Sequence, residues 1–388
     1  MTELADKSVN ERIGKRLKQV RESLGLSLKD ISPRAGFANY QTLSSIEKGQ
    51  RAIKASELSA LSALYSRDLS YFLTEDEPVE LAPVVAWRGV DPGVNRKPLE
   101  AQLHRLLMNY KLLEEITGED SECTLELWEK GQQQLTYEDV TRRADELRKS
   151  MNLGYRPASN LADALEKDTN TKIVNWPLGG VGSALSTRGE FGYAIILDTQ
   201  EAPWRRNSSL AHELFHLLAD NVYPLETLHQ EAPAQKPIEE TLADVFASAL
   251  LLPQEPLLTE IRKRSKDNKV EWMDLLQIAF EFGVSREALV WGLRRIGVLS
   301  QQRAKELVES VKLRSMDQHV RSGSYQQALA YSSRFVSLGL KALRQGKISK
   351  GKFCEIFGIS RTQFSDFIAD RGDLEDFSYE SEIELDHT

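Results

Sequence analysis

One short segment limits the folds open to this chain more than any other feature. Two histidines stand four residues apart within an otherwise apolar run, His212-Glu213-Leu214-Phe215-His216, flanked by Leu210, Ala211, Leu217 and Leu218. Residues at i and i+4 share one face of an α-helix. The segment therefore predicts a helix, apolar except on this face, that presents two imidazoles side by side in a dry, walled site.

The histidine spacing is typical of a metal site. Zinc takes neutral imidazole nitrogens and carboxylate oxygens in a tetrahedron, and a catalytic site leaves one position open. Glu213 stands one residue beyond the first histidine, where its carboxylate can take a proton from a water that the metal polarises. In a chain with six histidines, we estimate that this pattern arises by chance in roughly one chain in a hundred. We therefore expect one catalytic Zn²⁺ ion bound by His212 and His216.

A third ligand is expected from a neighbouring helix, because two histidines are too few for a zinc site. Glu240 and Asp244 are themselves at i and i+4. This spacing lets Glu240 bind zinc while Asp244 accepts a hydrogen bond from the second nitrogen of a ligand histidine. Glu239 is the alternative ligand, but its one-residue offset turns it about 100° around the helix. The pairing with Asp244 favours Glu240.

Residues from about 136 to 253 resemble the ImmA/IrrE family of zincin-like metallopeptidases. The resemblance rests on the two helices above, on Arg205 and Arg206 ahead of the first, on a helix at 137–153 and on strands at 173–174 and 194–197. It implies a small α+β domain and a gluzincin-like zinc endopeptidase that cleaves repressors or similar regulators. The family usually has Gly where Phe215 stands and often Asn where Asp244 stands. We therefore expect Phe215 to narrow the space beside the metal.

Peptide hydrolysis needs a donor to the oxyanion besides the metal. Tyr193, Tyr223 and His229 are the candidates for this role or for another substrate contact. The strand at 193–197 could receive an extended peptide by β-addition if it lies at an edge of its sheet.

Composition describes an ordinary soluble globular protein. The 388 residues are 41% hydrophobic and 28% charged, which allows two or three domains. No run approaches the roughly 18 apolar residues of a membrane helix, and residues 1–18 form no apolar signal-peptide core. The two cysteines, Cys123 and Cys354, lie far apart, which excludes a disulfide framework and a cysteine zinc site. We expect a cytoplasmic protein with no membrane partner.

Charge is distributed unevenly along the chain. The formal net charge of −8 argues against indiscriminate coating of nucleic acid, but residues 1–76 carry +2 and the rest carry −10. The N-terminal region is therefore the part able to approach phosphate.

That region holds four expected short helices, at about 13–24, 28–35, 40–48 and 55–65, separated by Gly25, Gly36 and Gly49. This N-terminal region resembles a Cro/repressor-type (XRE) helix-turn-helix, and the resemblance rests on residues 13–17, 25–27, 35–36 and 43–49. In that family the second helix of the motif enters the major groove of double-stranded DNA. The resemblance implies base contacts from Asn39, Tyr40, Gln41, Thr42 and Ser45, and phosphate contacts from Lys15, Arg16, Lys48, Arg51 and Lys54. Leu28 stands where the family often has a phosphate-contacting Gln. A module of the same fold that binds a protein is the alternative.

We expect an α+β, predominantly helical chain with a small sheet in its zincin-like core. The expected divisions are the helix-turn-helix at 9–74, a linker and helical connection at 75–135, the metallopeptidase core at 136–256, a helical subdomain at 257–300 and a helical C-terminal extension of unassigned role at 301–388. Strands are expected at about 84–87, 171–176 and 191–198. Beyond residue 198 we expect only helices, at about 207–220, 237–252, 270–282, 286–295, 301–315, 324–344 and within 347–369.

The leading functional hypothesis is a zinc metalloendopeptidase fused to a DNA-binding helix-turn-helix. Its substrate would be a repressor or antitoxin-like regulator in stress, phage or mobile-element control, and a homodimer is a further expectation. The alternative is a transcriptional regulator or toxin–antitoxin component that uses a zincin fold without significant proteolysis.

Overall fold

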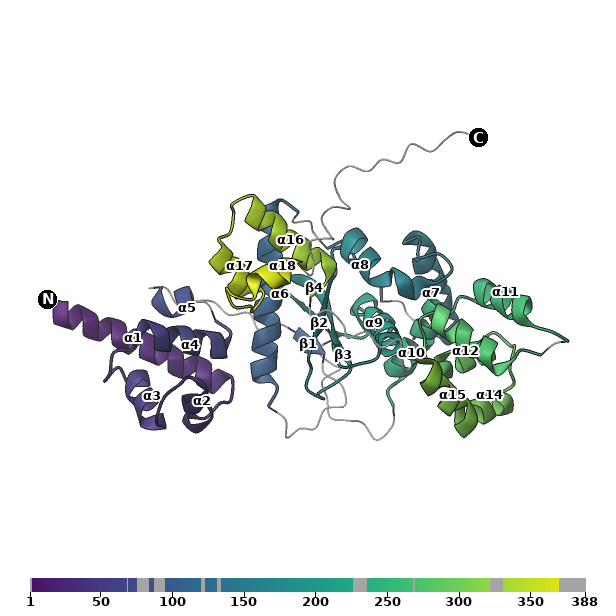
Figure 1. The fold of residues 1–388 in the computed structure, drawn as a ribbon, viewed down its shortest axis with the longest axis horizontal. Helices are drawn as coiled ribbons and strands as arrows, with labels where there is room; N and C mark the ends of the chain where they lie inside the picture. Colours follow the sequence, from purple (N-terminus) through teal and green to yellow (C-terminus); the bar gives the residue numbers. More distant parts are fainter. Residues whose placement is uncertain are drawn as a thin grey trace. The chain divides into compact units, whose positions relative to one another are not determined.

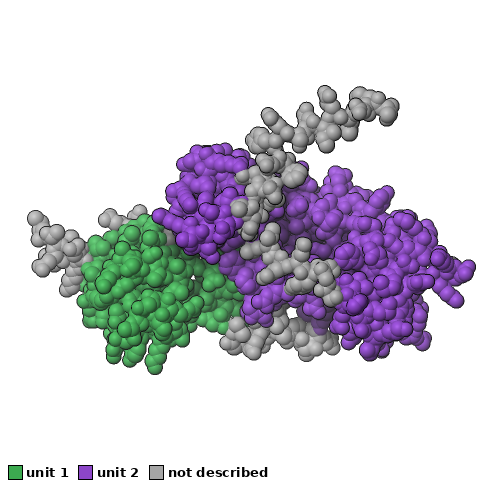
Figure 2. Space-filling model, in the orientation of Figure 1, with its two compact units in different colours: residues 1–83, 91–109 green, residues 84–90, 110–388 purple. Residues whose placement is uncertain are grey.

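The chain divides into two compact units, residues 1–83 with 91–109 and residues 84–90 with 110–388 (Figure 2). The computed structural model describes residues 2–67, 69–74, 84–86, 95–119, 123–130, 134–225, 236–267, 269–321 and 331–369. The described chain is mostly helical with one small sheet (Figure 1), so the expected α+β, predominantly helical class is confirmed. Within these residues, every helix is too short or too polar to traverse a lipid bilayer.

The first unit is built from short helices around one apolar core. They are α1 (Thr2–Ser23), α2 (Leu28–Arg34), α3 (Tyr40–Glu47), α4 (Ala55–Tyr65) and α5 (Leu69–Leu73), and the first part of α6 (Lys97–Thr117) belongs to the same unit. The four helices expected here are therefore present. Leu17, Leu43 and Leu61 are fully buried where α1, α3 and α4 meet.

Caps and one ion pair hold α3 in place. Ser27 begins α2 with a capping box to Asp30, and the Asn39 side chain accepts from the Thr42 amide at the start of α3. Arg21 of α1 binds Glu47 of α3 through two hydrogen bonds, of 2.7 and 3.0 Å, at a buried position. Such a bidentate pair fixes orientation as well as distance, so α3 has one defined setting on α1.

A four-stranded sheet lies in the second unit, in the order β1-β3-β4-β2. Its strands are β1 (Val84–Ala86), β2 (Lys172–Trp176), β3 (Ala184–Gly189) and β4 (Gly192–Asp198). Only β2 and β4 are parallel; β1–β3 and β3–β4 are antiparallel. The three expected strands are present, and β4 is an interior strand with both sides paired. The condition under which β4 could receive a peptide, a place at the sheet edge, is therefore not met.

Strand β3 and helix α11 (Gln254–Arg264) were not expected from the sequence. The β3 segment, Ala-Leu-Ser-Thr-Arg-Gly, has too few β-branched and aromatic residues to indicate a strand by itself. Its pairing with β4 makes it one, from Ala184 opposite Leu197 to Gly189 opposite Gly192. Pro256 argues against a helix in the sequence of α11. It lies in the first turn, however, where a missing amide costs no helix hydrogen bond.

Helices surround the sheet and extend beyond it. They are α7 (Tyr137–Ser150), η1 (Pro157–Ser159), α8 (Leu161–Thr169), α9 (Pro203–Leu218), α10 (Ile238–Leu251), α12 (Trp272–Glu281), α13 (Arg286–Arg295), α14 (Gln301–Glu309) and α15 (Val311–Arg321). Helix α9 packs on β3 and β4, and α10 packs on α7, α9 and α13. The helix expected at 301–315 is two helices, because Ser310 has extended backbone angles and its hydroxyl accepts from the Leu313 amide.

The last described helices are α16 (Ser333–Arg344), α17 (Lys350–Ile356) and α18 (Phe364–Ala369). They form an aromatic cluster with the end of α6, in which the Tyr110 and Phe335 rings stack with centroids 4.7 Å apart. Phe335, Phe353 and Phe357 are fully buried there. The segment that the sequence left unassigned is thus integral to the second unit.

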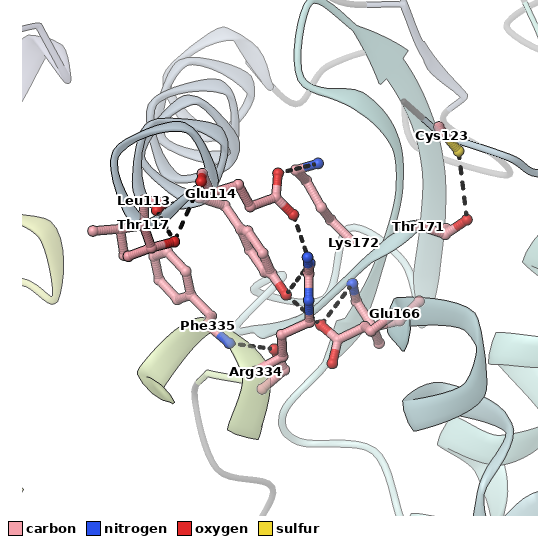
Figure 3. Close-up of polar contacts among 12 residues, drawn as sticks. Leu113, Glu114, Thr117, Cys123, Glu166, Thr171, Lys172, Arg334 and Phe335 are labelled. Carbon is pink, nitrogen blue, oxygen red and sulfur yellow. Dashed lines mark hydrogen bonds and ion pairs between the residues drawn. The ribbon is translucent and has the colours of Figure 1, made fainter. Parts of the chain in front are cut away.

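A buried charge network lies beside this cluster (Figure 3). Glu114 of α6 lies 2.9 Å from Lys172 of β2 and 2.5 Å from Arg334 of α16, and both Glu114 and Lys172 are almost wholly buried. The Tyr110 hydroxyl donates to Glu166 of α8 over 2.9 Å. Burial raises the pKa of Glu166 to about 7, against the hydrogen bonds that lower it. Four elements distant in sequence are therefore tied together by groups that are costly to separate.

The close approach of α1 and α3 gives a first prediction. A Cβ built on Gly14 would lie 2.9 Å from the Glu47 carbonyl oxygen and closer still to that of Ile46. Gly14→Ala should therefore cost about 1–3 kcal/mol through overpacking, partly offset by roughly 1 kcal/mol of helix propensity. Hydrogen exchange of α1 and α3 should accelerate, whereas Lys15→Ala at an exposed neighbour should not change it. Tryptophan fluorescence reports only the second unit, which holds all six tryptophans, and should be unchanged.

The raised pKa of Glu166 gives a second prediction. Its carboxyl keeps its proton to a higher pH in the folded state than in the unfolded state, where the ordinary pKa is about 4.5. Stability from this group is therefore present at low pH and falls as pH rises from about 4.5 to about 7. Glu166→Gln should remove that fall, which amounts to roughly 3 kcal/mol at most. Urea unfolding at several pH values measures this effect: the free energy of unfolding of Glu166→Gln should rise relative to that of the wild type as pH rises. A constant difference between the two proteins across this pH range would contradict the prediction.

Candidate metal centre and helix-turn-helix

Two packed helices carry the candidate metal ligands (Figure 1). Nε2 of His212 lies 3.3 Å from Nε2 of His216 and 3.4 Å from Oε2 of Glu240, and Nε2 of His216 lies 3.6 Å from Oε1 of Glu240. Ligand atoms about 2.1 Å from a tetrahedral ion lie about 3.4 Å from one another. The spacing of these three groups therefore fits a zinc ion, and the described residues contain no other such group of His, Cys, Asp and Glu.

Asp244 orients the first histidine. Its Oδ1 lies 3.0 Å from Nδ1 of His212, and its Oδ2 bonds Lys236. Partial burial would raise the pKa of Asp244, but the hydrogen bonds from His212 and Lys236 hold it below its usual range. With Nδ1–H of a neutral His212 donated to this carboxylate, the lone pair is on Nε2, facing Glu240 and His216. Converging electron pairs of this kind suit a cation.

Glu239 lies away from this cluster. It is one position before Glu240 at the start of α10, and its charge acts on the Tyr223 hydroxyl. The structure therefore brings Glu240, and not Glu239, to the two histidines.

Glu213 is on α9 between the histidines. It is only 3% exposed, and it lines the same cleft as His212 and Glu240. Most of its surface is thus withdrawn from solvent, and what remains accessible lines the cleft.

A cleft of about 1180 Å³ lies at the candidate metal centre, where His212 and Glu240 line it. Its walls come from α7, α9, α10, α13 and the start of β3. The lining residues that sequence reasoning missed include Tyr137, Thr141, Ser183, Ala184, Trp291, Arg294 and Arg295. Trp291, Arg294 and Arg295 share one helix face at i, i+3 and i+4. That spacing was the one feature of the sequence that could have pointed to these three residues, and it does not show that the shared face lines a cleft.

Phe215 does not line the cleft. Its side chain is fully buried behind His216, with ring centroids 5.5 Å from Trp128 and 5.9 Å from Phe246. The expectation that it narrows the space beside the metal is wrong, because the helix turns position 215 toward the core. The large ring instead holds the back of the His216 imidazole, at a centroid distance of 5.3 Å.

The expected oxyanion donors are not brought to the cleft either. The Tyr193 hydroxyl lies beside Arg188 and Asp220, and partial burial raises its pKa. Tyr223 stacks on Phe215 behind the metal centre, with centroids 6.5 Å apart. Neither is among the residues that line the cleft, so both expectations are corrected; His229 lies outside the described residues.

The residues expected to contact DNA fall into two groups, those exposed to solvent and those bonded to neighbouring groups of the same unit. Tyr40 and Gln41 are exposed on α3, as are Lys15, Lys48 and Lys54 nearby. Asn39 and Thr42 bond each other at the helix cap, and the Ser45 hydroxyl bonds the Gln41 carbonyl.

Two of the expected phosphate contacts are engaged within the unit. Arg16 is 5% exposed and donates to the carbonyls of Tyr71 and Thr74, so its assignment as a phosphate contact is wrong. Arg51 is paired with Glu57 at 2.8 Å. Arg16 is bound by carbonyl groups in and just after α5, and no pattern in the sequence indicated this contact.

Two family models match the chain. Residues 169–294 match the M78 peptidase model described as IrrE N-terminal-like domain, and residues 17–72 match a helix-turn-helix model. Among curated proteins, none matches. The chain carries a DNA-binding helix-turn-helix of the XRE type and an IrrE/ImmA-like metallopeptidase-type domain, which confirms the architecture that the resemblance implied.

The metal centre gives a third prediction. Purified wild-type protein should bind one zinc ion per chain, and Glu240→Ala should lose it, because two imidazoles are too few ligands. Asp244→Ala should weaken binding about 10- to 100-fold through loss of the oriented His212. Glu239→Ala is the matched control and should bind as the wild type. Competition with a chromophoric chelator measures all four, and zinc retained in Glu240→Ala would remove Glu240 from the ligand set.

Proposed function

We propose that this protein is a zinc-dependent endopeptidase that acts on a regulatory protein, with its helix-turn-helix bound to DNA. The observation that carries the proposal is the spacing of His212, His216 and Glu240, which fits a tetrahedral zinc ion, beside a cleft that His212, Glu240 and Glu213 line. The match to an M78 peptidase model supports the same class of activity.

Each residue of the centre has a distinct task. His212, His216 and Glu240 would hold the metal, and Asp244 keeps His212 in the tautomer that offers Nε2. Zinc in such a site polarises a carbonyl oxygen and lowers the pKa of water. Glu213 accepts a proton from the attacking water and passes it to the amine that leaves.

The cleft suits an extended peptide. Ala184 lies at the first position of β3 and lines the cleft. A peptide bound in the cleft lies beside this residue, whose backbone can bond an extended substrate. The proposal therefore places the peptide beside the start of β3 and not on β4.

The helix-turn-helix supplies the second activity. Tyr40 and Gln41 are the exposed side chains of α3 that can reach base edges, and Lys15, Lys48 and Lys54 can neutralise phosphates. A chain that binds DNA and cleaves proteins suits a repressor or antitoxin-like regulator as substrate, in stress, phage or mobile-element control. A regulator without proteolysis is the other outcome that the next experiment can give.

Removal of the general base gives a fourth prediction. Glu213→Gln keeps the size of the side chain but cannot take a proton, so hydrolysis should fall about 10²- to 10⁴-fold while zinc binding and DNA binding stay unchanged. The measurement is cleavage of regulators encoded beside the gene, followed by mass spectrometry.

Glu239→Gln is the matched control, one position outside the centre on α10, and should cleave at the wild-type rate. Equal cleavage by wild type and Glu213→Gln would refute the assigned role. No cleavage by the zinc-loaded wild type, together with sequence-specific DNA binding, would instead favour a regulator that does not use proteolysis.

A further inference from the structure

The acidic and basic residues of the cleft are separated along α10, because Glu240 lies in its first turn and Arg295 bonds carbonyls at its C-terminal end. Of its described lining residues, the acidic ones are Glu213, Glu240 and Asp244, all on α9 and α10 around the metal centre. The basic ones are Arg294 and Arg295, both at the end of α13. A substrate that spans the cleft therefore meets carboxylates at one position and guanidinium groups at another.

Arg295 is held in place without an acidic partner. Its Nη2 donates to the carbonyl oxygens of Ser248 and Leu252, over 3.3 and 2.6 Å, at the C-terminal end of α10. The negative end of a helix dipole stabilises a cation there. Among the described residues, no carboxylate lies within ion-pair distance of Arg295, and its buried Nε has no hydrogen-bond partner. Burial alone lowers the pKa of this guanidinium, since no acid raises it.

Arg295 is half-buried. Arg21, Arg286, Arg321 and Arg334 are buried or half-buried too, and each has a carboxylate partner, whereas Arg16, like Arg295, donates to backbone carbonyls. Burying a cation without a counter-charge is costly. Nη2 of Arg295 is bonded to two carbonyls and Nε is buried, so Nη1 is the group that can donate to a carboxylate in the cleft. Arg294, the adjacent residue, is exposed and also has no ion pair within the described chain.

We propose that Arg295, with Arg294, forms a subsite that binds a carboxylate of the substrate, namely an Asp or Glu side chain at a set distance from the cleaved bond. This inference rests on the proposed peptidase function for the identity of the occupant. Trp291, one turn earlier on α13, and Leu299 provide apolar walls beside the charge.

An acidic side chain fits better than the carboxyl terminus of a substrate. A second hollow of about 700 Å³ continues from the cleft and shares Tyr137, Thr141 and Arg295 with it. Since space continues past Arg295, the bound chain need not end there.

The test uses peptide selection, which does not require cleavage. Zinc-loaded Glu213→Gln protein is incubated with random decapeptides carrying amidated C-termini, and the bound peptides are sequenced by mass spectrometry. We expect Asp and Glu to be enriched over Asn and Gln about 10- to 100-fold at one position, the range for a charge-assisted hydrogen-bonded pair. In the Arg295→Gln background the ratio should fall to about one.

Controls separate this subsite from a structural role of Arg295. Arg314→Gln removes an exposed arginine of α15 outside the cleft and should keep the full enrichment. Arg295→Lys keeps a point charge and should keep part of it, and Arg294→Gln, at an exposed position, should lower it without a change in melting temperature. Equal enrichment of acidic residues with and without Arg295 would mean that Arg295 only caps α10, and this result would overturn the proposal.

Two further arms distinguish the remaining outcomes. Enrichment that appears only with free C-termini would overturn the side-chain assignment in favour of a terminal carboxylate. Digestion of the same pool by the wild type should place an acidic residue at one fixed distance from each cleavage site. Absence of any cleavage would refute the proposed peptidase function, whereas the binding selection would still support or overturn the subsite independently.

Discussion

The candidate metal centre depends on the packing of α9 against α10. Each helix alone offers ligands on one face, and only their contact brings Nε2 of His212 and His216 within 3.6 Å of the Glu240 carboxylate. The apolar faces that make this contact include Leu214, Phe215 and Phe246, all fully buried. Because the interior is close-packed, a change in these side chains would shift the helices and with them the ligands.

Residues outside the sequence motifs also support the packing of α9 on α10. Trp128, from the segment between α6 and α7, contacts both Phe215 and Phe246 edge-on. Arg295 joins the end of α13 to the end of α10 through two carbonyl oxygens. The C-terminal helices pack on α6 around Glu114 and Arg334, so the sheet under α9 is braced from the far end of the chain. These contacts explain why the second unit extends well beyond the residues of the peptidase family match.

The two units present surfaces of different charge chemistry. In the first, exposed lysines flank α3, whereas Arg16 and Arg21 are bound to backbone carbonyls and to Glu47. In the second, acidic groups surround the metal centre and two arginines stand apart from them on α13. The proposed DNA binding of the first unit and the proposed peptide cleavage by the second therefore rest on different charge patterns.

The sequence by itself determined the features that depend on local spacing. Positions i and i+4 placed His212 with His216 and Glu240 with Asp244, and turn glycines and caps separated the helices of the first unit. Tertiary structure decided what spacing cannot express. It buried Arg16 and turned Phe215 into the core, and it made β4 an interior strand by pairing it with a segment that lacks strand character. It also brought Arg295 from α13 to the cleft. The physical reason is that each of these outcomes is set by contacts between residues distant in sequence, whose energies appear only once the chain has packed.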